Sequence, residues 1–268
     1  MLDVQFGQAS DLGKVRTNNE DAMGSFIPSP PRPDNFAGFL FAVADGVAGL
    51  DLGEVASWTA IRVLTDEFAK APSGAMLNSL LPKLVQRANA AVFDRALEPG
   101  NSGKAMATTL VACALRYDRA VVSHVGDSRC YLVRNGEARQ ITEDHTFVNE
   151  QRKLGLISAE EIRTSESRHL LTRSLGAEMF VAPETNALTV RAGDVLVLCT
   201  DGLHDEMQEE EIAAIAGQSK SPDEIARELV TRAIEIDGSD NATVQVIQVR
   251  AVERMSSMPR GKPNRPSS

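Results

Sequence analysis

Short apolar runs recur along the chain, and three of them lead directly to an aspartate. Runs of five to seven apolar residues are typical of buried strands. The run "FLFAVA" is followed by Asp45, "AVVSHVG" by Asp127, and "VLVLCT" by Asp201. We therefore predict strands at 39–44, at 120–125 and at 195–200, each of which delivers a carboxylate to its end.

A period of three to four residues replaces this pattern after residue 53 and predicts two helices. The apolar stripe of the second helix includes Pro82, so we expect that helix either to begin late or to kink. The expected buried face of the first helix is Val55, Trp58, Ile61, Leu64 and Phe68, and that of the second is Leu77, Leu80, Leu81, Leu84, Ala88 and Val92.

A third helix is predicted to begin after Ser221. Ser221 is a suitable N-cap, Pro222 suits the first helical position, and Glu224 completes a capping box. Residues 242–249 then alternate and predict a final strand, while residues 2–6 predict the first. Polar residues at 144–176 predict a small excursion from the core, with a capping box at Ser158.

Residues 106–142 read as four strands joined by short turns. Asn135-Gly136 is a strong hairpin signal, because both turn residues need positive φ. Connections this short leave no room for crossover helices, so we expect one antiparallel meander. The expected fold class is α+β, with antiparallel sheets and helices packed outside them, rather than a doubly wound parallel sheet.

Composition disfavours several classes of function. The chain has 268 residues, 43% of them hydrophobic, and a net charge of −9. Negative charge disfavours nucleic acid as the main partner. Three cysteines without a C-x-x-C pair argue against a disulfide framework or a zinc knuckle. No signal peptide and no apolar run of about 20 residues is present, which predicts a cytoplasmic protein with no membrane partner.

Five aspartates are candidates for a metal site. Carboxylates that converge at strand ends repel one another unless a cation or a proton compensates. Oxygen ligands without His or Cys clusters favour Mg²⁺ or Mn²⁺. Asp-Gly is also a common turn dipeptide, and any one of these residues taken alone favours a turn. The five are Asp21, Asp45, Asp127, Asp201 and Asp240.

The ordered set of motifs resembles the metal-dependent protein phosphatases of the 2C type, in their bacterial form. The resemblance spans nearly the whole chain up to residue 250. The motifs are "RTNNEDA" (16–22), "FAVADGVAGLDLGEVAS" (41–57), "ATTL" (107–110), "VGDSRCYLVRNG" (125–136), "LTRSLG" (171–176), "GDVLVLCTDGL" (193–203) and "DNATV" (240–244).

The resemblance implies a four-layer α/β/β/α sandwich: two antiparallel sheets flanked by antiparallel helix pairs, with a binuclear metal site at one edge. It implies a catalytic domain at 1–250, a flap at about 144–176, and a disordered basic tail at 251–268. Its implied activity is hydrolysis of phosphoserine and phosphothreonine in proteins, with a Ser/Thr kinase or its targets among the partners.

The same resemblance assigns roles to individual residues. Asp45 would bridge two Mn²⁺ or Mg²⁺ ions, and the Gly46 carbonyl would bind one of them. Asp201 and Asp240 would hold one ion, with Asp21 close by, and Asp127 would share a third, weaker ion with Asp201. Arg16 would bind the phosphate, which makes Arg16 and Asp45 the expected catalytic residues. A hydroxide between the two ions would attack phosphorus without an enzyme nucleophile.

Some positions depart from the family pattern. Val47 stands where some members carry a histidine proposed to protonate the leaving group, and valine cannot donate a proton. Ala48 replaces a glycine, and Leu50 stands where many bacterial members have histidine. These departures leave room for an alternative, a pseudophosphatase that binds partners on the same fold.

A third hypothesis is an aspartyl-nucleophile phosphatase of the haloacid dehalogenase type. That chemistry requires D-x-D after a strand, and neither Asp45 nor Asp201 has the second aspartate. Of the four histidines, His124 is expected to pack in a strand, and His145 and His169 border the flap, where they could meet substrate. His204 is expected near the metals, in a supporting or surface role.

Overall fold

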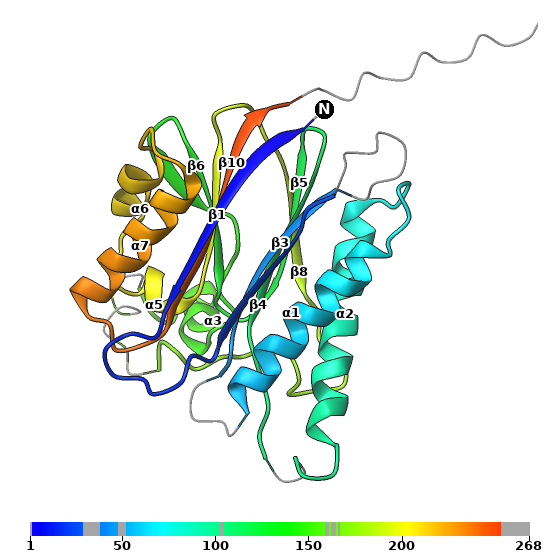
Figure 1. The fold of residues 1–268 in the computed structure, drawn as a ribbon. Coiled ribbons are helices and arrows are strands. Elements are labelled where there is room, and N and C mark those ends of the chain that lie inside the picture. The colour runs from blue at the N-terminus through cyan, green and yellow to red at the C-terminus, as the bar shows by residue number, and fades with distance from the viewer. Residues whose placement is uncertain are drawn as a thin grey trace, which may run out of the picture.

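A computed structural model describes residues 2–28, 38–47, 52–101, 104–158, 161, 165 and 167–252, and their strands form two antiparallel five-stranded sheets. The two sheets face each other, and helices cover both outer faces (Figure 1). The predicted four-layer α/β/β/α sandwich is therefore confirmed.

The first sheet joins the two ends of the chain. In spatial order it contains β1 (Asp3–Asp11), β10 (Ala242–Ala251), β9 (Val195–Cys199), β6 (Arg129–Arg134) and β7 (Glu137–Gln140). The second sheet contains β2 (Asp21–Phe26), β3 (Phe39–Asp45), β4 (Leu110–Arg116), β5 (Arg119–Val125) and β8 (Glu184–Thr189). One apolar cluster, which includes Phe41 and Leu196, fills the space between the sheets.

Helices complete a core on each outer face. On the second sheet, α1 (Gly53–Ala69) and α2 (Leu77–Ala96) pack side by side, and on the first sheet α6 (Glu209–Ala216) and α7 (Pro222–Ile236) do so (Figure 1). Two short helices, α3 (Phe147–Lys153) and α5 (Asp201–His204), lie toward one end of the sandwich. No helix in the described part of the chain is long and apolar enough to cross a membrane.

Helices α1 and α2 form where they were predicted, but the exposure of Trp58 differs from expectation, and Pro82 lies within α2. The side chain of Trp58 is 58% exposed and lies under the Arg62 guanidinium, 4.9 Å from the ring centroid. Ile61, Leu64 and Phe68 are buried as predicted. Ala56 and Ala60 are buried beside them, and such small residues let the helix approach the sheet closely. Helix α2 begins at Leu77, five residues before the proline in its interior, so it does not begin late.

The predicted meander is two hairpins in two different sheets. β4 and β5 pair in the second sheet, whereas β6 and β7 pair in the first. The chain crosses from one sheet to the other at Gly126, whose φ of +98° is the left-handed conformation that glycine adopts without strain. The crossover places Asp127 between the sheets, which a continuous meander would not do.

Five of the described elements were not predicted from the sequence. β2 and β8 are half-buried strands without an apolar run, and the helices α3, α5 and α6 have at most eight residues. The capping box of α7 forms as predicted, with mutual hydrogen bonds between Ser221 and Glu224. β10 ends at Ala251, one residue past the predicted domain boundary, and residues 253–268 of the predicted tail lie outside the described residues.

Candidate metal centre

Asp21 and Asp45 meet at one edge of the second sheet. β2 begins at Asp21 and β3 ends at Asp45, and the antiparallel register makes the two residues direct partners. The backbone of Asp45 is fixed by Thr109, whose Oγ1 accepts its N–H at 2.9 Å, and by Thr108, whose Oγ1 donates to its carbonyl at 2.7 Å. These bonds hold the end of β3 in one position.

Asp201, Asp127 and Asp240 approach this edge from the first sheet. Asp201 opens α5 directly after β9, and the preceding Thr200 donates through Oγ1 to Asp21 Oδ2 at 2.9 Å. Asp127 lies at the crossover between the sheets, and Asp240 stands two residues before β10. The Asp201 carboxylate lies close enough to Asp45 to raise the pKa of the Asp45 carboxyl.

The carboxyls of Asp21, Asp45, Asp127 and Asp201 hold protons more tightly than ordinary aspartates do. Burial and then the Asp201 carboxylate raise the pKa of Asp45 well above its usual range. Burial and then Asp201 do the same for the pKa of Asp127. Burial, reinforced by Asp201, raises the pKa of Asp21 to about 7, although hydrogen bonds from Thr243 and Thr200 oppose the shift. The site therefore carries more negative charge than its surroundings can neutralise.

The donor set fits hard divalent cations. Asp21 Oδ1 and Asp201 Oδ1 are buried and make no hydrogen bond, so two oxygen ligands are available without breaking an existing contact. Carboxylate and carbonyl oxygens suit Mg²⁺ and Mn²⁺. Asp127 and Asp240 carry further carboxylates at the same edge. The structure brings all five predicted aspartates to one end of the sandwich.

Gly46 follows Asp45 at a very close contact between two backbone segments. A Cβ on Gly46 would lie 2.4 Å from the carbonyl carbon of Gly53 at the start of α1. The Gly46 N–H donates to the Glu20 carbonyl at 3.1 Å. Glycine is therefore required here, and Val47 follows it with its N–H bonded to the Ala107 carbonyl. The predicted departures at Ala48 and Leu50 lie outside the described residues.

Arg16 lies at the edge of the same site. Its Nη2 donates to Asp240 Oδ2 at 2.6 Å, and both side chains are about one-third exposed. Burial acts to lower the pKa of Arg16, but the Asp240 carboxylate outweighs it and the pKa is raised. Arg16 therefore remains charged, with the open side of its guanidinium accessible to an anion.

Asn241 is a site residue that the sequence reasoning did not single out. Its Oδ1 accepts the Glu20 N–H at 2.8 Å, and its Nδ2 donates to the carbonyls of Leu12 and Asn18 at 2.9 and 3.2 Å. Asn241 is buried, so the loop that carries Arg16 is fastened to the Asp240 segment. Its position directly after a candidate ligand was the only available signal.

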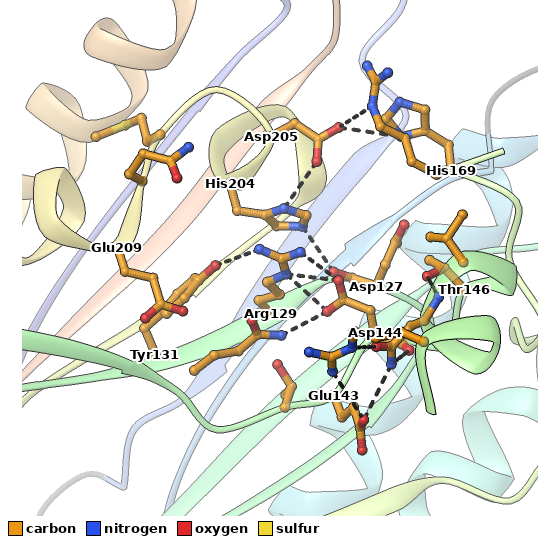
Figure 2. Close-up of a pocket in the computed structure, with 18 of the residues that line it drawn as sticks. Asp127, Arg129, Tyr131, Glu143, Asp144, Thr146, His169, His204, Asp205 and Glu209 are labelled. Carbon is orange, nitrogen blue, oxygen red and sulfur yellow. Dashed lines mark hydrogen bonds and ion pairs between the residues drawn. The ribbon is translucent and has the colours of Figure 1, made fainter. Parts of the chain in front are cut away.

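Asp205 and His169 also border the site. His169 Nδ1 lies 3.4 Å from Asp205 Oδ2 and 3.9 Å from Asp201 Oδ2, and its side chain is about half exposed. His204 is buried, and its Nε2 contacts the Asp127 carbonyl at 3.0 Å (Figure 2). His204 is therefore not a surface residue, and its supporting role near the metals stays a prediction. Asp205 was missed, although it lies four residues after Asp201.

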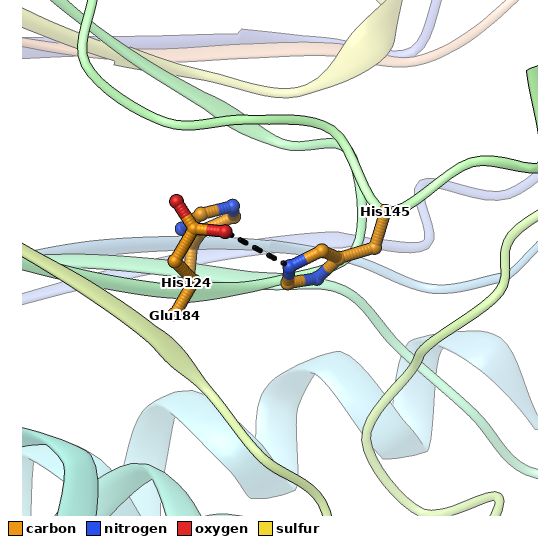
Figure 3. A group of neighbouring side chains, drawn as sticks. All are labelled: His124, His145 and Glu184. Atoms are coloured by element: carbon orange, nitrogen blue, oxygen red, sulfur yellow. Dashed lines mark ion pairs between the residues drawn. The ribbon is translucent and has the colours of Figure 1, made fainter. Parts of the chain in front are cut away.

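The two remaining histidines form a buried pair next to the Gly126 turn. His124 lies in β5 as predicted, and its ring stacks on His145 with the centroids 4.7 Å apart (Figure 3). His145 Nε2 is 3.7 Å from Glu184 Oε2. With only 1% of its surface exposed, His145 does not face a substrate, contrary to one expectation. It braces the turn before Asp127, since its N–H donates to the Gly126 carbonyl and its Nδ1 accepts the Gly126 N–H.

Comparison with known proteins gives one consistent result. Residues 7–242 match the family model described as Protein phosphatase 2C. The serine/threonine phosphatase stp of Listeria innocua is 33% identical over 248 residues, which cover 91% of this chain and 96% of that protein. The serine/threonine protein phosphatase PstP of Mycobacterium tuberculosis is 37% identical over 250 residues, which cover 92% of this chain and 45% of that protein.

Solved structures agree with this match. The crystal structure of PstP from Mycobacterium tuberculosis superposes with a TM-score of 0.80 at 36% identity, and covers 93% of this chain and 100% of that one. The catalytic domain of PstP in complex with two manganese ions gives a TM-score of 0.78 at 36% identity and the same coverage.

Proposed function

Because the chain belongs to the protein phosphatase 2C family, we propose that its clustered aspartates hold the Mn²⁺ or Mg²⁺ ions with which it hydrolyses phosphoserine and phosphothreonine in proteins. The observation that carries this proposal is the meeting of five carboxylates at one edge, with two buried oxygens lacking any hydrogen bond. The protein is a metal-dependent serine/threonine phosphatase, and phosphorylated proteins are its substrates.

The proposed ligands divide between two ions. Asp45 is paired with Asp21 and has its pKa raised by Asp201, which supports the proposal that Asp45 would help to hold both ions. The Gly46 carbonyl and the Asp240 carboxylate would each help to hold one of the two ions, and Asp127 with Asp201 would hold a third, weaker ion. When bound, the ions supply Lewis acidity toward the phosphoryl group and lower the pKa of water.

Arg16 is proposed to bind the phosphoryl group of the substrate. A guanidinium offers two parallel N–H donors that match two phosphoryl oxygens, a fit that lysine does not reproduce. Its existing bond to Asp240 Oδ2 fixes the guanidinium beside the proposed ions. The side chain of Val47 cannot donate a proton to the leaving group, so that proton must come from another donor.

The structure gives less support to the two alternatives, a pseudophosphatase and an aspartyl-nucleophile phosphatase. A pseudophosphatase would be expected to have lost part of the acidic set, and here the whole set is gathered. An aspartyl-nucleophile enzyme requires a second aspartate near the first along the chain, whereas Asp21 reaches Asp45 from a neighbouring strand.

The decisive experiment is a phosphatase assay with matched variants. We expect the purified protein with MnCl₂ to hydrolyse p-nitrophenyl phosphate and a phosphothreonine peptide, and to lose both activities in EDTA. Asp45→Asn should abolish turnover and weaken Mn²⁺ binding in calorimetry while the protein stays folded. Asp66→Asn, an exposed aspartate on α1, is the control. Absence of Mn²⁺-dependent hydrolysis in the unmodified protein would refute the proposal.

Organisation and location are also proposed. The catalytic domain is 1–250 with the flap at about 144–176, and 251–268 is a tail. We place the phosphatase in the cytoplasm, where its three buried, unpaired cysteines would stay reduced, and opposite a Ser/Thr kinase. A phosphoproteome comparison with and without the protein would identify the opposing kinase's targets.

A further inference from the structure

A groove of about 780 Å³ opens beside Asp127, between α3 on one side and the α5–α6 segment on the other (Figure 2). From its charges we infer that this phosphatase prefers protein substrates that carry arginine or lysine near the phosphorylated residue. The inference rests on the proposed function, because it concerns the chain on either side of the reacting phosphate.

The groove adjoins the proposed metal site through Asp127, the one proposed ligand that lines it. Asp127 lies at one part of its wall, and Glu209 and Glu210 at the start of α6 lie at another. A phosphorylated side chain held at the aspartates would leave its neighbouring residues beside this groove. An extended chain advances about 3.3–3.6 Å per residue, so residues a few positions away reach the walls.

Three of the six acidic residues that line the groove, Glu143, Asp144 and Asp205, have cationic partners within the protein. Asp144 on the floor accepts from Arg129 Nη2 at 2.6 Å and Nε at 3.0 Å, and from Gln140 Nε2 at 2.9 Å. Glu143, beside α3, has Lys153 Nζ at 3.4 Å. Because cationic side chains of the protein already compensate these carboxylates, they are not available to bind a cationic side chain of a substrate.

Glu209 and Glu210 differ in that both are exposed. In the described part of the chain, neither side chain forms an ion pair or a hydrogen bond. Glu211, the next residue, pairs with Arg232 Nε on α7 at 2.6 Å instead. Acidic residues in a first helical turn are favoured by the helix dipole. Of the three glutamates in this turn, Glu209 and Glu210 line the groove and are accessible to a substrate.

Arginine or lysine is the chemistry that complements these two glutamates. Arginine forms paired N–H bonds to a carboxylate, and lysine provides a point charge. Exposed ion pairs contribute modestly, so each glutamate should change the preference for a basic substrate about two- to five-fold. An acidic substrate should be repelled from the same wall.

The test compares three phosphothreonine peptides that differ only in two flanking positions, occupied by arginine, glutamine or glutamate. The measured quantity is the ratio of kcat/KM for the arginine peptide to that for the glutamate peptide, within each protein variant. We compare the unmodified protein with Glu209→Gln and Glu210→Gln. The control is Glu137→Gln, which removes the same charge from an exposed residue in the β6–β7 hairpin, outside the groove.

We expect a ratio above one in the unmodified protein, about two- to five-fold lower in each groove variant, and unchanged in the control. Raising KCl to about 0.5 M should lower the ratio by screening. A ratio near one, or an equal fall in the control, would overturn the inference, the latter because net charge alone would explain the preference. Hydrolysis of p-nitrophenyl phosphate by the unmodified protein with MnCl₂ distinguishes failure of the proposed function from failure of this inference. If there is no hydrolysis, the proposed function is refuted. If hydrolysis occurs without a charge preference, only the inference is refuted.

Discussion

Asp21 and Asp45 are direct partners across the β2–β3 ladder, so the register of two neighbouring strands brings two carboxylates face to face. Like charges directly opposite each other destabilise a sheet. The fold maintains the pair because Thr200 bonds Asp21 and Thr109 fixes the Asp45 backbone. Protons or cations must supply the remaining compensation, and this makes the stability of the protein depend on both.

Removal of divalent cations should make thermal stability fall as pH rises from about 4 to about 7. The pKa of Asp21 is raised to about 7, chiefly by burial, whereas unfolded aspartate titrates near 3.9. The folded chain therefore binds the proton more tightly, so this stabilisation is complete below pH 4 and is lost as pH approaches 7. The slope should be up to about 1.4 kcal/mol per pH unit for each such group.

The measurement is the melting temperature in EDTA between pH 5 and 8, repeated with MnCl₂. With Mn²⁺ the carboxylates are held ionised, so we expect a higher Tm and a weaker dependence on pH. Asp21→Asn should reduce the slope in EDTA. A Tm in EDTA that stays flat or rises over this range contradicts the assignment of the raised pKa values.

Substitution of Asn241 should damage both stability and substrate binding. Asn241→Ala leaves the Glu20 N–H and the carbonyls of Leu12 and Asn18 without their partner, and a buried unsatisfied group costs about 1–3 kcal/mol. Because the loop also carries Arg16, KM for a phosphopeptide should rise more than kcat falls. Urea unfolding and steady-state kinetics measure the two effects. Asn78→Ala, an exposed residue on α2, should change neither.

Gly46 should not tolerate a side chain. In Gly46→Ala the new Cβ would lie 2.4 Å from the Gly53 carbonyl carbon, which forces apart the segments that precede and begin α1. Such overpacking costs about 1–3 kcal/mol, and the Gly46 carbonyl would move away from the proposed ion. We expect weaker Mn²⁺ binding by calorimetry. Gly74→Ala is the control, because nothing lies within 4 Å of the added methyl.

Substitution of His145 should change the response to acid. Burial and then the neighbouring His124 lower the pKa of His145 to about 3, whereas unfolded histidine titrates near 6.5. Between these values the unfolded chain binds the extra proton, so this stabilisation is present above pH 6.5 and is lost as pH falls toward 3. His145→Gln should remove this one contribution, so the difference in unfolding free energy between the unmodified protein and the variant should shrink as pH falls from 6.5 to 4. An unchanged slope in urea titrations would be inconsistent with a neutral buried His145.

The sequence by itself determined the local features of this protein. Alternation and apolar runs predicted most strands, because a strand that buries one or both faces must carry apolar residues there. Asp-Gly after a buried run marked Asp45 and Asp201 as strand-end carboxylates. The Ser221 capping box was readable because it involves only four consecutive residues. The ordered motifs then predicted the two-sheet sandwich, which the structure confirms.

Only the tertiary structure decided which of these elements meet. An apolar pattern shows that a strand is buried but not in which sheet, so the crossover at Gly126 was invisible in the sequence. β2 has no apolar run, and its place is set by pairing with β3. The contacts of Arg16 with Asp240 and of Asn241 with Glu20 join residues more than two hundred positions apart. Such contacts depend on how the two sheets pack together, which local sequence patterns do not specify.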